Sequence, residues 1–368
     1  MAETNNTPKI GAAQIKLLER LSNACGVSGD EGAVRKIVLE EIEGAADEVR
    51  TDALGSVMAI KRGRGRNRPK VMLAAHMDEV GFMLTSDEGK GVYRFMVAGG
   101  IDARNLAGKP VWVGKEQTPG VIGLAPIHLT SASERSSAVS VSSLRIDIGP
   151  KNGGKFKIGT RAAFATTFMR IGPSLRGKAM DDRIGVATLI TLLKHAPENI
   201  DLMAAFTVQE EVGLRGAKVA AHALAPDMAF ALDCTPSMDL PTHDDSENTL
   251  YRSKLGSGPA IYVGDGSTLS DPRLVKLLRQ AGDEDGIPYQ IRQPGGNSGG
   301  LGLGSRSLSA HTGLNRAAQG LAEQRSAAAC LLAPDHPHNA QKPALILTGA
   351  NDEIIGKKTG RDHRPLRL

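Results

Sequence analysis

Residues 70–81 have the sequence KVMLAAHMDEVG, and this stretch decides the fold. Its first six residues form a short, mainly apolar run next to a charged loop, which is typical of a strand buried inside a sheet. His76 and Asp78 follow directly where that strand is expected to end. Open α/β sheets bind ligands just beyond the carboxyl ends of their parallel strands. The stretch therefore predicts a buried strand and a site at its end.

Helical and strand patterns alternate on both sides of this stretch. Such alternation predicts an α/β fold with a mainly parallel sheet covered by helices on both faces. Ser28 precedes a helical pattern and is expected to cap that helix. Helices are predicted over residues 12–24, 184–193, 216–223 and 271–286, and strands over 48–60 (with a turn at Gly55), 70–75, 202–209, 228–233 and 289–291.

The pattern changes between residues 80 and 173, where short alternating stretches are separated by Gly, Pro and Ser clusters. Frequent turns between short strands predict a small β-domain inserted into the α/β pattern. A chain of 368 residues is also long for a single core. We therefore expect a discontinuous α/β domain (residues 1–79 and 174–297), an inserted β-domain (80–173) and an atypical C-terminal segment (298–368).

Composition and charge argue against a nucleic-acid partner. Only 3% of the residues are aromatic, whereas surfaces that bind single-stranded nucleic acid stack bases on aromatic side chains. Residues 298–368 hold nine Lys or Arg and five Asp or Glu, so most of the net charge of +5 lies there. The rest of the chain is nearly neutral and does not resemble a surface that follows phosphates.

Nothing in the sequence indicates export or membrane insertion. No run of 18 apolar residues occurs, and residues 1–10 lack the apolar core of a signal peptide. Cys25, Cys234 and Cys330 are widely spaced and form no C-x-x-C pair, so neither a disulfide framework nor a thiolate zinc site is expected. We expect a cytoplasmic protein with no membrane partner.

Further acidic residues share the structural position of His76 and Asp78. Singly, a loop histidine, a helix-capping Asp or a Glu in a turn needs no functional explanation. Together, carboxylates this close repel one another unless a cation neutralises them. Imidazole and carboxylate ligands without thiolate suit zinc, cobalt or manganese, so the joint pattern predicts a metal centre. The added residues are Glu210 and Glu211 after strand 202–209, Asp233 at the end of strand 228–233, and Asp181 and Asp182 at the start of a helix.

The motifs HMDEVG (76–81), MDDRIG (180–185), QEEVGLRGA (209–217) and ALD (231–233) occur in this order. The residues and spacing of these motifs resemble those of the glutamyl/tetrahedral (TET) aminopeptidases, metallopeptidase family 42, and the resemblance covers roughly residues 10–297. The resemblance implies a cytoplasmic metallopeptidase that removes N-terminal residues from short peptides. It also implies two divalent metal ions per chain and self-assembly into homo-oligomers through a β-barrel-like domain, which the predicted insert would be.

The resemblance also implies the metal ligands. Asp181 would bridge the two metal ions. His76 and Asp233 would complete the site of one ion, and Glu211 would hold the other. Zinc or cobalt would fill these sites, with manganese as a third candidate.

Two further roles follow from the same resemblance. Glu210 would be the general base acting on a metal-bridging hydroxide, since a Glu that is not a ligand keeps the basicity to move a proton. Asp78 would hold the second nitrogen of His76 and fix its tautomer.

The C-terminal segment departs from the family pattern. The family has one more histidine ligand after a late strand, on the Glu211 side, and no matching strand follows residue 297. His311 comes too early, while His336 and His338 come late. The segment is either an altered tail or the product of a reading-frame shift near residues 297–300. In both cases the second metal site and the turnover of this chain are expected to be weak.

Two other functions compete with the aminopeptidase hypothesis. A scaffold that keeps the fold and one metal but lacks turnover would explain the missing histidine. A glycoside hydrolase would use Glu210 and Glu211 as its two carboxylates. Adjacent side chains do not readily flank one scissile bond at the roughly 5–10 Å that such enzymes use, and His76 would have no role.

Overall fold

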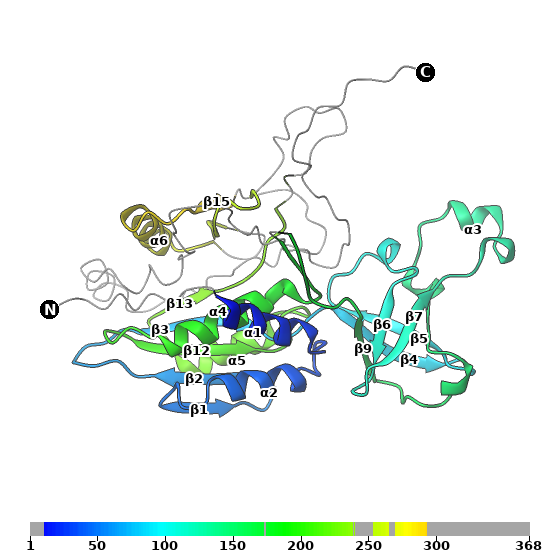
Figure 1. Cartoon of the computed structure of the whole chain (residues 1–368), viewed down its shortest axis with the longest axis horizontal. Coiled ribbons are helices and arrows are strands. Elements are labelled where there is room, and N and C mark those ends of the chain that lie inside the picture. The colour runs from blue at the N-terminus through cyan, green and yellow to red at the C-terminus, as the bar shows by residue number, and fades with distance from the viewer. Residues whose placement is uncertain (1–10, 173, 238, 240–252, 265–268, 293–368) are drawn as a thin grey trace, which may run out of the picture.

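The computed structural model describes residues 11–172, 174–237, 239, 253–264 and 269–292. Within them, a central sheet with its helices lies beside a closed barrel (Figure 1). Segment 298–368 lies outside the described residues, and so do the alternative ligands His311, His336 and His338. The predictions made for that segment remain predictions.

The centre of the α/β part is a five-stranded sheet. Its strands are β1 (Glu48–Thr51), β2 (Val57–Lys61), β3 (Lys70–His76), β12 (Asp201–Thr207) and β13 (Met228–Ala231). In space they follow the order β1-β2-β12-β3-β13. β3 pairs in parallel with β12 and with β13, whereas β1 with β2 and β2 with β12 are antiparallel pairs.

The sheet is thus mixed, whereas the sequence predicted a mainly parallel one. Parallel neighbours need a crossover of about a dozen residues or more, and the link over residues 62–69 is shorter than that. β3 therefore runs opposite to β2. Because β12 is parallel to β3, it meets β2 in the antiparallel sense. Parallel order is confined to the half of the sheet that carries the predicted site.

Helices cover both faces of this sheet, as predicted. They are α1 (Ala12–Asn23), α2 (Gly32–Glu41) and α4 (Met180–Lys194) on one face and α5 (Arg215–Leu224) on the other. Successive side chains of a strand point to opposite faces. Leu73 and Ala75 accordingly belong to the core under α1, α2 and α4, while Met72 and Ala74 pack with α5. Burial on both faces explains why β3 is an unbroken apolar run.

The start of α2 differs from the prediction. Glu31 is the N-cap residue, and no side chain caps the helix. The Ser28 hydroxyl instead donates a 2.6 Å hydrogen bond to the buried carboxylate of Asp78. Gly29 adopts a left-handed φ of +82°, so the chain turns between Ser28 and α2. The serine therefore supports the end of β3 and not the helix.

The insert forms a closed six-stranded barrel, on the right in Figure 1. Its spatial order is β4-β5-β8-β7-β6-β9. Phe82 lies at its centre with no exposed surface, and the rings of Phe95 and Phe164 meet it edge-on at 5.1 Å. The β-rich insert expected from the sequence is present, and its status as a separate domain over 80–173 stays a prediction. The strands are β4 (Gly81–Asp87), β5 (Val92–Ala98), β6 (Pro110–Val113), β7 (Thr118–Gly123), β8 (Arg145–Asp147) and β9 (Arg161–Phe164).

The remaining elements connect these two parts or follow them. An antiparallel hairpin of β10 (Met169–Ile171) and β11 (Ser174–Arg176) leads from the barrel into α4. Further along, β14 (Ala260–Tyr262), α6 (Pro272–Glu284) and β15 (Gln290–Arg292) form a parallel strand–helix–strand unit. None of the helices described has both the length and the apolar character needed to cross a membrane. Short helical turns are α3 (Ala132–Ser136), η1 (Ala103–Asn105), η2 (Ile127–Leu129), η3 (Val141–Ser143) and η4 (Pro150–Asn152).

Candidate metal centre

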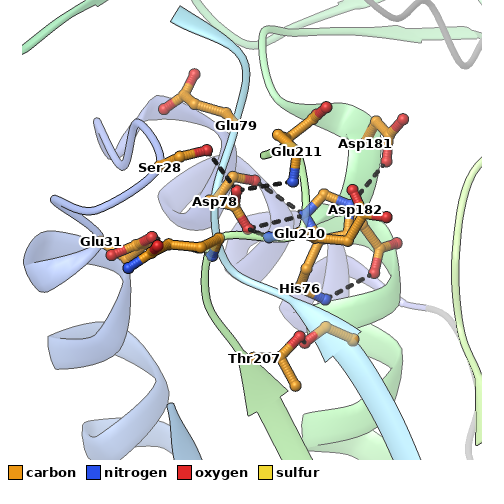
Figure 2. Close-up of polar contacts among 12 residues, drawn as sticks. Ser28, Glu31, His76, Asp78, Glu79, Asp181, Asp182, Thr207, Glu210 and Glu211 are labelled. Atoms are coloured by element: carbon orange, nitrogen blue, oxygen red, sulfur yellow. Dashed lines mark hydrogen bonds and ion pairs between the residues drawn. The ribbon is translucent and has the colours of Figure 1, made fainter. Parts of the chain in front are cut away.

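Three parallel strands end at one edge of the sheet and carry the predicted site residues. His76 is the last residue of β3 and pairs in register with Thr207, the last residue of β12. Glu210 and Glu211 follow β12, and Asp233 follows β13. Because these strands are parallel, their carboxyl ends meet at one edge. Figure 2 shows His76, Glu210 and Glu211 close together there.

The imidazole of His76 lies at the middle of the cluster. Its Nε2 is 3.1 Å from Asp181 Oδ1 and 3.9 Å from Asp233 Oδ1. Ligand atoms of these three residues all lie within 4.8 Å of one another. Within the residues described, they form the one group of three or more His, Cys, Asp or Glu side chains this close. Glu211, the predicted ligand of a second ion, is not part of that group.

Asp78 holds the other side of the imidazole. His76 Nδ1 lies 3.2 Å from the Asp78 backbone oxygen and 3.4 Å from its Oδ1. Acceptors at Nδ1 favour a proton there, and a neutral ring with that proton would offer its Nε2 lone pair to a cation beside Asp181 and Asp233. The Asp78 carboxylate is fully buried and also accepts from the backbone N–H groups of Glu210 at 2.9 Å and Glu211 at 3.1 Å. One carboxylate thereby fixes the ends of both β3 and β12.

Asp181 and Asp182 are adjacent but have different partners. Both depart from helical φ and ψ within α4. The Asp182 carboxylate is buried and accepts from the N–H groups of Gly185 at 2.9 Å and His76 at 3.2 Å. A Cβ at Gly185 would lie 2.3 Å from that carboxylate, so glycine is required there. Asp181 is left as the residue of this pair that faces His76 Nε2.

The cluster crowds negative charge into a buried space. Burial, with the charges of Asp181 and Asp182, raises the pKa of Asp233 well above its usual range. Burial, opposed by His76 and reinforced by Asp181, raises the pKa of Glu211 to about 8. Burial alone would lower the pKa of His76, but its hydrogen bonds to Asp181 and Asp78 raise it strongly. A cation bound among these groups would offset the repulsion between their charged forms, and one imidazole with carboxylates is a donor set that zinc, cobalt and manganese accept.

Comparison with known proteins identifies the family. Residues 55–303 match the family described as M42 glutamyl aminopeptidase. The chain belongs to this family. The match ends at residue 303, six residues beyond residue 297, where the resemblance in the sequence ends.

Relatives of this M42 chain share most of its length. The lysyl aminopeptidase of Pyrococcus furiosus is 31% identical over 75% of this chain and 79% of its own length. The TET1 peptidase of Pyrococcus horikoshii, whose structure is described as assembling into a tetrahedron or a large octahedral shell, is 33% identical with a TM-score of 0.65. That comparison covers 77% of this chain and 85% of the other. A Thermotoga maritima protein described as an endoglucanase is 33% identical over 75% and 83% of the two chains, with a TM-score of 0.63.

The M42 chain also contains residues near the site that sequence reasoning missed. Glu79, Lys178 and Arg183 are buried, and Glu79 pairs with each of the two cations. Each lies inside or next to a quoted motif, so charged residues in apolar surroundings were a visible signal. Their pairing across about a hundred residues of chain was not visible, because periodicity reports only local structure.

Proposed function

We propose that this chain is a metal-dependent aminopeptidase that removes N-terminal residues from peptides. The observation that carries the proposal is the convergence of His76, Asp181 and Asp233 on one point at the edge of the sheet. Membership of the M42 family supports it independently. A divalent cation held there would act as a Lewis acid toward the scissile carbonyl and toward water.

The residues divide the work as follows. Asp181, His76 and Asp233 would hold one cation, and Asp181 with Glu211 would hold a second. Asp78 keeps the His76 ring in the orientation that presents Nε2. We expect the second cation to bind more weakly, because the sequence after residue 297 shows no counterpart of the strand and histidine that the family adds on the Glu211 side.

Glu210 acts as the general base. Its side chain is buried, and its backbone is fixed by the Asp78 carboxylate. In the reaction the Glu210 carboxylate takes a proton from the attacking water while the new C–O bond forms. The same proton then passes to the amine nitrogen as the C–N bond breaks.

The competing hypotheses have less support. A glycoside hydrolase would need Glu210 and Glu211 on opposite sides of one bond, yet both residues are anchored to the same Asp78 carboxylate. The description of the Thermotoga maritima relative as an endoglucanase does not change this placement of the two glutamates in the present chain. A scaffold with one metal and no turnover remains the second candidate, because it follows from the altered C-terminal segment.

Paired substitutions at the adjacent glutamates test the division of labour. Glu210→Gln should lower turnover of a chromogenic aminoacyl substrate by about 10²–10⁴-fold and leave the bound metal near wild type. Glu211→Gln should lose the weaker metal. If Glu210→Gln lost metal as severely as Glu211→Gln, the assignment of the base would be wrong. A wild type that binds one metal and hydrolyses nothing would favour the scaffold.

We also propose that residues 80–173 form an assembly domain, since a related TET peptidase assembles into shells. Removing this segment should leave the α/β part folded and lower the oligomeric mass in light scattering. An unchanged mass with a folded core would contradict the assembly role.

A further inference from the structure

A buried cluster of charged residues adjoins the segments that carry the proposed metal site. The Glu79 carboxylate meets Lys178 Nζ at 2.8 and 3.0 Å and Arg183 Nη2 at 3.3 Å. The side chains of Glu79, Lys178 and Arg183 are 2%, 3% and 0% exposed. We call these three residues the Glu79 cluster. None of them is among the ligands or the base proposed above.

The Glu79 cluster joins the segments that carry the site. Glu79 directly follows Asp78, while Lys178 and Arg183 lie three residues before and two residues after Asp181. The ion pair between Glu79 and Lys178 therefore ties the end of β3 to the start of α4. His76 Nε2 and Asp181 Oδ1 face each other across this same junction.

The end of α1 completes the junction. Lys178 Nζ donates to the Ala24 carbonyl at 2.8 Å, and Arg183 Nη1 donates to the same carbonyl at 3.1 Å. Gly26 N–H donates to Glu79 Oε1 at 2.8 Å, and the Glu79 N–H donates back to the Gly26 carbonyl at 3.0 Å. Three segments distant in sequence are thus held by one carboxylate and two cations.

The segments at this junction are closely packed. A Cβ at Gly26 would lie 2.8 Å from Arg183 Nη2, and a Cβ at Gly177 would lie 2.4 Å from the Ser22 hydroxyl. That hydroxyl donates to the Lys178 carbonyl at 2.6 Å. These positions therefore have no room for a larger side chain, and the close packing of the backbone limits shifts of the segment before Asp181 relative to β3.

Such a cluster is an inefficient way to gain stability. Removing charges from water costs more than their attraction returns unless the geometry is excellent, and apolar packing of equal volume is often as stable. A buried tether does, however, fix one relative placement of the chains it joins. Arg183 also places a positive charge close to the carboxylates of Asp78 and Asp182, which offsets part of their repulsion.

We infer that Glu79 and Lys178 are positioning residues, which hold Asp181 at the distance from His76 that one cation requires. The inference rests on the proposed function, because it assumes a cation at His76 and Asp181. A positioning role predicts a loss of metal affinity that is separate from any loss of stability.

A double-substitution cycle separates the two effects. The Glu79 cluster carries one negative and two positive side chains. Glu79→Gln leaves both cations unpaired. Adding Lys178→Met restores the wild-type net charge while keeping the tether cut. Glu88→Gln is the matched control, since Glu88 also pairs with two cations, Arg94 at 2.5 Å and Arg145 at 2.6 Å, but on the barrel surface.

The experiment is a Co²⁺ titration of the full-length chain, followed by visible absorption, with thermal melting of each variant. Glu79→Gln should bind Co²⁺ about 10–100-fold more weakly, the range found for residues that orient ligands, and show an altered spectrum. The double variant Glu79→Gln with Lys178→Met should melt at a higher temperature than Glu79→Gln alone, but its Co²⁺ affinity should stay as low as that of Glu79→Gln. Glu88→Gln should match wild type in affinity and spectrum.

Other outcomes overturn the inference. Affinity that recovers together with stability in the double variant would reduce the cluster to a structural role. Wild-type affinity in Glu79→Gln would refute the inference and leave the proposed function intact. A wild type that binds no Co²⁺ would contradict the proposed function itself, and the inference with it. Should Glu79→Gln not fold, Lys178→Met alone, with Glu79 still paired to Arg183, is held to the same expectation.

Discussion

Glu79 at the sheet edge and Glu88 on the barrel have the same kinds of partner in opposite surroundings. Each carboxylate pairs with two cationic side chains. The Glu88 side chain is 31% exposed, so water screens its ion pairs and they contribute little to stability. The Glu79 side chain is 2% exposed, so its charge was removed from water at a substantial desolvation cost. Because the exposed ion pairs of Glu88 form without this desolvation cost, stability alone does not explain why the ion pairs of Glu79 are buried.

The contrast extends to the whole of both regions. Within the described barrel strands and their loops, Thr118 and the Tyr93 hydroxyl are the polar side-chain groups of buried residues, and the interior is otherwise apolar. The sheet edge buries His76, Asp78, Glu79, Asp182 and Glu210 together. The barrel interior is therefore mainly apolar, whereas the sheet edge buries ionisable side chains whose charges a bound cation would neutralise.

The largest effect on stability should come from the barrel interior. Ile146 on β8 has no exposed surface, so Ile146→Ala should destabilise the protein by about 2–5 kcal/mol through lost contacts and the cavity left behind. Metal affinity should not change. Urea unfolding and a Co²⁺ titration measure the two quantities. Metal affinity that falls with stability would remove the distinction between the two regions.

At the sheet edge, Asp233→Asn should change stability less than Ile146→Ala does, and it should stabilise the metal-free protein instead of destabilising it. Asp233→Asn removes one of the crowded carboxylates, so the metal-free protein should melt about 2–4 °C higher, the shift that roughly 1 kcal/mol produces. Its metal affinity should fall, because a ligand is lost. Differential scanning calorimetry in chelator and a Co²⁺ titration test both parts. A lower melting temperature would show that the carboxylates do not repel.

Asp102 on the barrel is the matched control for that variant. A hydrogen bond from the Arg104 side chain, with one from its backbone N–H, lowers the pKa of Asp102 to about 2. The carboxylate is thus stabilised as the anion. Asp102→Asn should raise neither the melting temperature nor the metal affinity.

The smallest expected effect on stability depends on pH and concerns Asp201, the first residue of β12, at the end of that strand away from the proposed metal site. Burial disfavours the charge of Asp201, but hydrogen bonds from Arg68 at 2.7 Å and from the Gly63 N–H at 3.0 Å outweigh it and lower the pKa of Asp201. A carboxyl whose folded pKa is lowered stabilises the fold above its ordinary value of about 3.9, and this contribution is lost as pH falls through the folded pKa. Asp201→Asn should therefore melt below wild type at pH 7, with a gap that closes in strong acid. A gap independent of pH would contradict the ion-pair explanation.

The sequence was most informative where chemistry and local periodicity coincide. KVMLAA predicted a doubly buried strand, and β3 is one. The placement of His76, Glu210 and Asp233 after three strands predicted their convergence, because parallel strands end at one edge. The change of pattern after residue 80 predicted a β-rich insert, and a closed barrel occupies that place.

The sequence was least informative about pairing between distant segments. Strand order and the antiparallel contact of β2 with β12 depend on where β12 inserts, which periodicity does not encode. Ser28 had the local pattern of a helix cap, yet its partner is Asp78, fifty residues away. Asp181 and Asp182 are chemically alike in sequence, and their tertiary partners separate them: Asp182 accepts from the Gly185 and His76 N–H groups, whereas Asp181 faces His76 Nε2.

The central claim is that the sheet edge holds a divalent cation through His76, Asp181 and Asp233. The most direct measurement is a Zn²⁺ titration of wild type and His76→Ala against a competing chelator, with circular dichroism to confirm the fold. We predict at least one tightly bound ion per wild-type chain, and its loss in a folded His76→Ala. A wild type that binds no ion, or a His76→Ala that binds it equally tightly, would contradict the account.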